Sequence, residues 1–209
     1  MNQNRDYLQD ISSIRTAMER SVKFLSLSGL SGVLAGMYAL AGAAMAWYVL
    51  ASPHSATEHP QPHNPQPVGQ LLLIAAVVLV LSLLTGYFLS LQKSKRLGVS
   101  VWNKTSRDFL SSLFIPLSAG GLFIVILIYH QYFALAAPAS LIFYGLALLN
   151  ASFFTVREIR YLGFSEIVMG LFAALWPHLA LLLWAAGFGL LHIIYGLVVH
   201  YRYDREKSL

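Results

Sequence analysis

Two histidines near the end of the chain, His178 and His192, are the side chains best placed for chemistry within a long apolar segment at 165–201. The glycines in the stretch 186–189 favour a tight turn, so we expect a hairpin that bends there. At about 1.5 Å per residue, His178 then lies about 13 Å and His192 about 8 Å from the turn. The two rings are therefore predicted to be neighbours on adjacent antiparallel helices.

Imidazoles at membrane depth have three chemical uses. They can ligate haem or a metal ion, they can relay protons, or they can stay neutral and hydrogen-bonded as structural groups. We favour the third interpretation, because Pro177 frees carbonyl groups close to His178. One tight hairpin also leaves little room for a haem between two ligands. We therefore expect no cofactor, and we keep bis-histidine haem or metal binding as an alternative.

Three further polar side chains lie inside or at the edge of predicted membrane spans: Glu166, Asn150 and His200. We expect Glu166 to begin a span and to pair with Arg157 or Arg160 at the inner membrane surface. The alternative is a proton- or cation-coupled site that Glu166 forms with His200 at similar depth. Asn150 is the polar candidate within the preceding span.

The stretch 52–69 contains five prolines together with His54, Glu58, His59 and His63. Such side chains can bind Zn²⁺ or Cu²⁺ weakly, but proline at this density favours extended chain, so we interpret the stretch as a solvent-exposed outer linker. The chain has no cysteine, and no nucleophile elbow, phosphate-binding loop or zinc-protease motif occurs in it. We expect no enzymatic activity, no catalytic residue and no metal site.

The elements that must position these residues are membrane-spanning helices. Of the 209 residues, 57% are hydrophobic and 11% are charged, whereas a soluble domain carries about 25% charged residues. Runs of about 20 apolar residues suffice to cross a bilayer. We predict an all-α integral membrane protein with one six-span domain at 24–203, arranged as three tandem hairpins, with spans near 24–51, 70–91, 109–129, 138–156, 166–185 and 188–203.

The distribution of basic residues predicts the orientation of these spans. All Lys and Arg residues fall in the two termini and in the segments between spans 2 and 3 and between spans 4 and 5. Cytoplasmic segments of membrane proteins are enriched in Lys and Arg, so both termini are predicted to be cytoplasmic. The net charge of +5 is thus explained by orientation in the inner (plasma) membrane and not by nucleic-acid binding.

Both ends of the chain outside the spans are short. Residues 1–23 place apolar side chains at spacings of three or four, which predicts an amphipathic helix on the cytoplasmic membrane surface. It could instead pack on the bundle or dock an unknown protein partner. Residues 204–209 form a cytoplasmic tail.

Glycines mark the surfaces where the helices pack. Gly32 and Gly36 lie four residues apart in span 1, and small residues let helix backbones approach closely in lipid. We interpret this face as an intramolecular packing surface, with homo-oligomerisation as the alternative. Two internal similarities add three further packing positions. Residues 29–39 align with 163–173, which matches Gly36 with Gly170. Residues 142–146 align with 193–197, which matches Gly145 with Gly196.

The final stretch, 166–177 followed by 187–196, resembles the last hairpin of small six-span bacterial inner-membrane proteins. These include the HdeD-type acid-resistance membrane proteins and uncharacterised membrane proteins of Bacteroidota. The resemblance implies a class of membrane protein and no specific activity. We expect a non-enzymatic membrane protein with a structural, stress-response or partner-binding role. The alternatives are a small-solute or ion transporter built from hairpin repeats, and the haem or metal protein described above.

Overall fold

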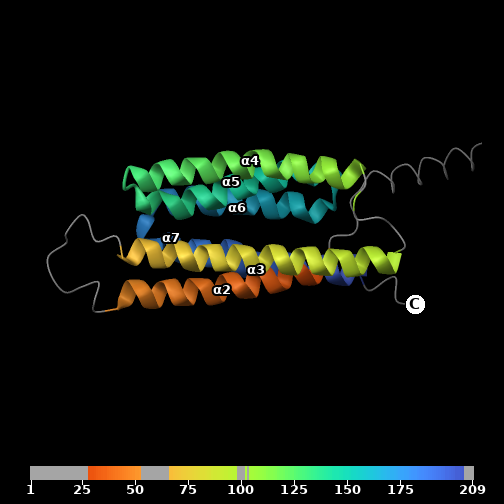
Figure 1. The fold of residues 1–209 in the computed structure, drawn as a ribbon, viewed down its shortest axis with the longest axis horizontal. Helices are drawn as coiled ribbons and strands as arrows, with labels where there is room; N and C mark the ends of the chain where they lie inside the picture. The colour runs from red at the N-terminus through yellow and green to blue at the C-terminus, as the bar shows by residue number, and fades with distance from the viewer. Residues whose placement is uncertain (1–27, 53–65, 98–101, 103, 205–209) are drawn as a thin grey trace, which may run out of the picture.

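The computed structural model describes residues 28–52, 66–97, 102 and 104–204, and these residues form a bundle of long helices lying side by side (Figure 1). No strand occurs among them. The predicted amphipathic helix at 1–23, the histidines of the outer linker and the tail beyond residue 204 lie outside the described residues. The first five long helices are α2 (Gly29–Ala51), α3 (Gln66–Leu97), α4 (Lys104–Tyr129), α5 (Ala136–Ala151) and α6 (Arg157–Leu175).

Short 3₁₀ turns, Phe133–Leu135 and Ser152–Phe154, flank α5. After α6 the chain forms one further rod, which we call the C-terminal helix (residues 177–204). It begins as a 3₁₀ turn and alternates between α-helical and wider π-helical segments: η4 (Pro177–Leu179), α7 (Ala180–Trp184), η5 (Ala185–Leu191), α8 (His192–Val199) and η6 (His200–Asp204).

Five stretches of the described residues are helical, long and apolar enough to cross a membrane: Gly29–Ala51, Val68–Arg96, Lys104–Tyr129, Phe133–Phe154 and Pro177–Tyr203. The remaining helix, α6, has 19 residues and lies in the same bundle. It differs from the others because Arg157, Glu158, Arg160 and Glu166 interrupt its apolar sequence. The molecule is therefore an all-helical protein with the features of a membrane protein.

The predicted turn at 186–189 is wrong. These residues lie inside the C-terminal helix, and the chain turns instead at Trp176, whose φ of −123° and ψ of 78° are not helical. A residue before proline is pushed out of the α region, and proline is favoured at the first position of the next helix. The pair Trp176–Pro177 thus ends one helix and starts the next. As a result, the spans predicted at 166–185 and 188–203 are replaced by helices at 157–175 and 177–204.

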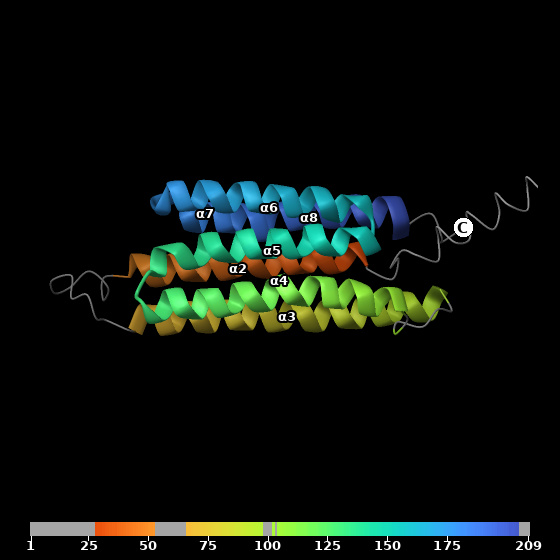
Figure 2. The same ribbon diagram turned by 90° about the horizontal axis from the view of Figure 1, so that it is seen from above.

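The helices pack in a definite order. α3 lies along α2, α2 packs on the C-terminal helix, the C-terminal helix contacts α6, α6 packs on α5, and α5 packs on α4 (Figure 2). Two apolar clusters lie between α5, α6 and the C-terminal helix. One contains Leu141, Ala173 and Ala180, and the other is centred on Leu148, Leu162 and Val199.

Glycines permit two close helix contacts. A Cβ added at Gly36 would lie 2.7 Å from Cγ1 of Ile193, and one added at Gly170 would lie 2.6 Å from Cγ1 of Ile142. These two contacts are equivalent in the internal alignment, in which Gly36 matches Gly170 and Ile193 matches Ile142. The aligned pairs of helices, α2 with α8 and α6 with α5, therefore pack in the same way.

The other predicted packing glycines lie in the same two contacts. A Cβ added at Gly145 would lie 2.5 Å from the carbonyl oxygen of Gly163, and one added at Gly196 would lie 2.7 Å from that of Gly29. A Cβ at Gly32 would lie 3.2 Å from Cα of Gly196. The small-residue face of span 1 is thus covered by the C-terminal helix of the same chain. The homo-oligomer alternative stays a prediction.

Candidate functional site

The side chain of Glu166 lies in the middle of α6 and is completely buried, with 0% exposure. α6 begins at Arg157, nine residues before Glu166, which places the carboxylate about 13 Å along the helix. Neither carboxylate oxygen has a hydrogen-bond partner among the described residues. A buried polar atom without a partner is costly and is uncommon in native proteins, so it marks a candidate functional group.

His192 is a titratable neighbour of Glu166. Its Nδ1 lies 3.4 Å from Oε1 of Glu166 and 3.1 Å from the carbonyl oxygen of Gly187. The side chain is buried, with 7% of the residue exposed. A carbonyl oxygen only accepts hydrogen bonds, so Nδ1 carries a hydrogen and donates it to Gly187.

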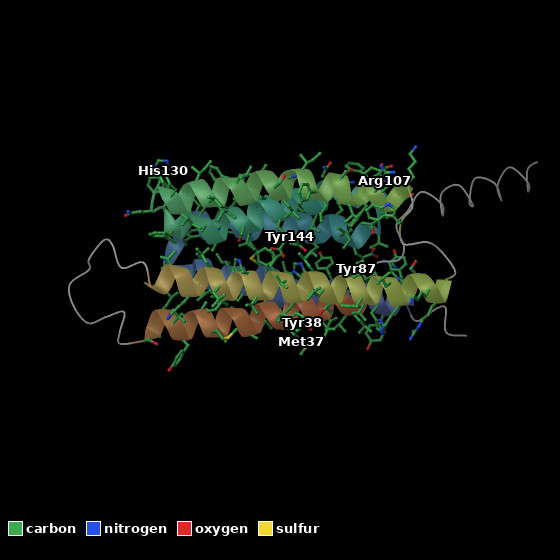
Figure 3. The ribbon with its side chains drawn as sticks, viewed as in Figure 1. Met37, Tyr38, Tyr87, Arg107, His130 and Tyr144 are labelled. Carbon is green, nitrogen blue, oxygen red and sulfur yellow. The ribbon has the colours of Figure 1, made fainter. Side chains whose placement is uncertain are left out.

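Tyr144, which Figure 3 labels, lies on α5 and contacts the other nitrogen of the imidazole. Its hydroxyl lies 2.8 Å from Nε2 of His192. With Nδ1 protonated, the Nε2 of a neutral ring accepts, and the tyrosine hydroxyl donates. Tyr144, Phe188 and His192 also pack against one another, with ring centroids 5.0 to 5.9 Å apart. These contacts hold the imidazole in one orientation.

Gly187 makes room for the carboxylate. A Cβ added there would lie 2.5 Å from Oε2 of Glu166 and 2.7 Å from Cδ2 of Leu141. Gly187 lies in the π-helical segment Ala185–Leu191, and π-helical turns occur frequently at functional sites. The glycine that the sequence indicated as a turn residue therefore lines the buried site.

The charge of this site follows from its burial. An ionised side chain at the centre of a bilayer costs about 3 kcal/mol or more. A carboxylate beside a neutral imidazole would leave one unpaired negative charge. A neutral site needs one proton shared between Glu166 and His192, either as carboxylic acid with imidazole or as carboxylate with imidazolium. We call Glu166, His192 and Tyr144 the Glu–His–Tyr site.

The predicted pairing of His178 with His192 is wrong. His178 is exposed at the turn between α6 and the C-terminal helix, and His192 is buried 14 residues further along that helix, about 21 Å away. These two histidines therefore do not lie together as a pair that could ligate haem. The error follows directly from the misplaced turn.

The other predicted polar residues also lie apart from one another. His200 is eight residues after His192, so it is not at the depth of Glu166 as predicted. Asn150 donates from Nδ2 to the carbonyl oxygen of Ser112 at 2.7 Å and thereby joins α5 to α4. No group of three or more His, Cys, Asp or Glu side chains within the described part of the chain lies close enough together to hold a metal ion.

The expected pair of Glu166 with Arg157 or Arg160 is also wrong. A different glutamate on α6, Glu158, forms an ion pair with an arginine. Glu158 accepts a hydrogen bond from Nη1 of Arg202 at 2.9 Å, and the Tyr203 hydroxyl donates to its Oε2 at 3.2 Å. This second group joins the start of α6 to the end of the C-terminal helix. The same two helices are thus joined by polar contacts at two depths.

Sequence reasoning missed Glu158 and Tyr144. Glu158 lies eight residues before Glu166, a spacing that places both carboxylates on one face of a helix. That spacing was a usable signal. Tyr144 lies within the aligned segment 142–146, but nothing in its sequence context distinguishes it from its counterpart Tyr195. Only the arrangement of the helices shows which tyrosine contacts His192.

Comparisons of the chain with protein-family models, with curated proteins and with solved structures give no match. The functional argument therefore depends on the geometry of the Glu–His–Tyr site itself.

Proposed function

We propose that this chain is a non-enzymatic polytopic protein of the inner (plasma) membrane that responds to pH through the Glu–His–Tyr site. The observation that carries the proposal is the completely buried Glu166. Its oxygens lack hydrogen-bond partners among the described residues, and Nδ1 of His192 lies 3.4 Å from one of them. A role in stress response fits this arrangement, because a change in protonation inside the bundle alters the packing of α6 on the C-terminal helix.

The proposal includes six spans with both termini cytoplasmic. The ends of the described helices support this orientation, because basic residues gather at one end of four of them. They lie at the end of α3 (Lys93, Lys95, Arg96), the end of the C-terminal helix (Arg202), the start of α4 (Lys104, Arg107) and the start of α6 (Arg157, Arg160). The chain has no cysteine, so single cysteines report topology cleanly. A cysteine at the exposed His130 should be labelled by an impermeant reagent from outside, and one at the exposed Lys104 should not. The reverse pattern would overturn the orientation.

The response to acid depends on His192. A second proton added to the neutral site creates a net positive charge in the core, which is costly in lipid. Stability therefore falls as pH falls, since stability rises with pH wherever the unfolded state binds more protons.

The response to alkali depends on Glu166. Removal of the single shared proton leaves a buried carboxylate beside a neutral imidazole, with a net negative charge. A buried net charge is costly in lipid, so stability should fall as pH rises. Of the described residues, the titratable groups that face the pair are Tyr144 on α5 and the two partners themselves, on α6 and the C-terminal helix.

Melting temperatures in detergent across the range from acid to alkaline pH test the proposal. The parent should be most stable in between, Glu166→Gln should lose the fall at alkaline pH, and His192→Gln should lose the fall at acid pH. His178→Ala is the matched control, because this exposed histidine lies at the end of the bundle, and it should keep both. Variants that respond to pH as the parent does would refute the proposal.

A small-solute or ion transporter is the second candidate function. One observation favours it: Glu166 and Tyr144 come from one pair of equivalently packed helices, α5 and α6, and His192 comes from the other pair. Binding sites of transporters often lie at the interface between repeats. Uptake of solutes into liposomes that contain the protein would separate this function from a purely structural response.

A further inference from the structure

We propose that a cavity at the start of α4 binds the phosphate headgroup of an anionic phospholipid. The cavity is open and has a volume of about 610 Å³, which is within the range of small-molecule binding sites. Five residues line it: Trp102, Lys104, Arg107, Asp108 and Ser111. This inference goes beyond the proposed function, because it involves neither the Glu–His–Tyr site nor a response to pH.

The charges of the lining side chains favour an anion. Lys104 and Arg107 are exposed, and neither side chain forms an ion pair or a hydrogen bond within the described residues. The arginine guanidinium presents paired N–H donors that match the oxygens of a phosphate, and the lysine adds a second positive charge. With the negative Asp108, the cavity has a net charge of +1. One phosphodiester neutralises this charge, whereas a zwitterionic headgroup leaves it in place.

The other two polar side chains fit the group that is attached to the phosphate. Ser111 donates its hydroxyl hydrogen to the carbonyl oxygen of Asp108 at 3.0 Å, so its oxygen is left as an acceptor. The carboxylate of Asp108 also only accepts hydrogen bonds. These two acceptors suit a headgroup with hydroxyl groups, such as phosphoglycerol.

The cavity continues into an apolar surface along the same face of α4. Residues three or four positions apart share one face of a helix, so Phe114 and Ile115 follow Ser111 on this face. Their side chains are 69% and 67% exposed. Acyl chains attached to a phosphate beside Arg107 can therefore lie along Phe114 and Ile115. A free phosphate ion has no use for this surface, which favours a lipid as the ligand.

The cavity also lies at the depth of lipid headgroups. Figure 3 shows Arg107 near one end of α4, while His130 lies at the other end of the helix. α4 is long and apolar enough to cross a membrane, so its ends lie near the two membrane surfaces. Trp102 directly precedes the helix and is 68% exposed, and tryptophan is enriched at the level of the headgroups.

Native mass spectrometry of the full chain in detergent tests the site, because it counts the lipids bound to each variant. The probes are dioleoyl phosphatidylglycerol and the zwitterionic dioleoyl phosphatidylcholine. A basic residue beside an anionic membrane surface strengthens binding about fivefold, so Lys104→Gln/Arg107→Gln should weaken phosphatidylglycerol binding about 25-fold. Lys95→Gln/Arg96→Gln is the matched control, since it removes the same charges from exposed positions at the end of α3. It should keep the parent affinity.

The parent should prefer phosphatidylglycerol, and the charge-conserving exchange Lys104→Arg/Arg107→Lys should keep this preference. Equal binding of the two lipids by the parent would overturn the site, and so would equal losses in the two glutamine pairs. If the pair at 104 and 107 fails to fold, Arg107→Gln alone should weaken binding about fivefold, and an unchanged affinity overturns the site. Displacement of phosphatidylglycerol by inorganic phosphate would overturn the assignment to a lipid.

Discussion

Gly187→Ala is the substitution that most directly tests the buried position of the Glu166 carboxylate. The added Cβ would lie 2.5 Å from Oε2 of Glu166 and 2.7 Å from Cδ2 of Leu141. Both neighbouring side chains are completely buried, so neither can move aside into open space. Overpacking of this kind costs about 1–3 kcal/mol.

We expect a loss of about 2 kcal/mol, because two buried groups are displaced at once. Each kcal/mol lowers the melting temperature of a chain of this size by about 2–4 °C, so the melting temperature should fall by about 6 °C. Differential scanning fluorimetry in detergent measures this change. Gly121→Ala is the matched control, since a Cβ at that helical position meets nothing within 4 Å.

A second substitution identifies the clash. Glu166→Ala removes the carboxylate, so the double variant Gly187→Ala/Glu166→Ala should recover stability relative to the sum of the single changes by about 1 kcal/mol, the coupling expected for residues in contact. If Gly187→Ala is as stable as Gly121→Ala, or if the two changes simply add, the carboxylate does not lie against Gly187.

Three further predictions concern the helix contacts around the site. Gly36→Leu should lower the melting temperature without changing the oligomeric size in gel filtration, because the new side chain meets the Gly189 carbonyl and Ile193 of the same chain. An altered size at unchanged stability would contradict the intramolecular contact. Arg202→Ala should lower the free energy of unfolding by about 0.5–1 kcal/mol in a melting experiment, since the arginine side chain is 69% exposed but its partner Glu158 is buried. Arg160→Ala, at an exposed position of α6, is the control and should be neutral. Equal effects would mean that Glu158 does not depend on Arg202. The fluorescence of Trp184 should respond to pH in the parent and not in His192→Gln, because Trp184 packs on Phe188 and Phe188 packs on His192. If the response persists in His192→Gln, another titratable group causes it.

The apolar runs of the sequence predict the helices well, because length and composition decide whether a segment can cross a bilayer. They do not decide where a long apolar run turns. Between 165 and 201 two signals compete, the glycines at 187 and 189 and the proline at 177. Proline excludes the preceding residue from the helix by steric clash, whereas glycine only tolerates a turn and also permits close packing. In this chain the steric restriction decides the position of the turn.

The candidate site could be predicted only in part, for the same reason. Glu166 and His192 were both identified as intramembrane ionisable residues, but their pairing depends on the register between α6 and the C-terminal helix. That register follows from the turn at Trp176. The five packing glycines were easier to identify, since close helix contacts in lipid need small residues wherever they occur. Tyr144 required the three-dimensional arrangement of α5 beside His192.

The central claim is that Glu166 and His192 share one proton inside the bundle at neutral pH. Nitrogen NMR of the chain labelled in histidine tests it most directly, because the two ring nitrogens report their hydrogens separately. We predict that His192 carries a hydrogen on Nδ1 at neutral pH and that Glu166→Gln shifts the Nδ1 resonance strongly, while His178→Ala leaves it unchanged. A His192 signal that does not respond to Glu166→Gln, or a ring without hydrogen on Nδ1, would contradict the account.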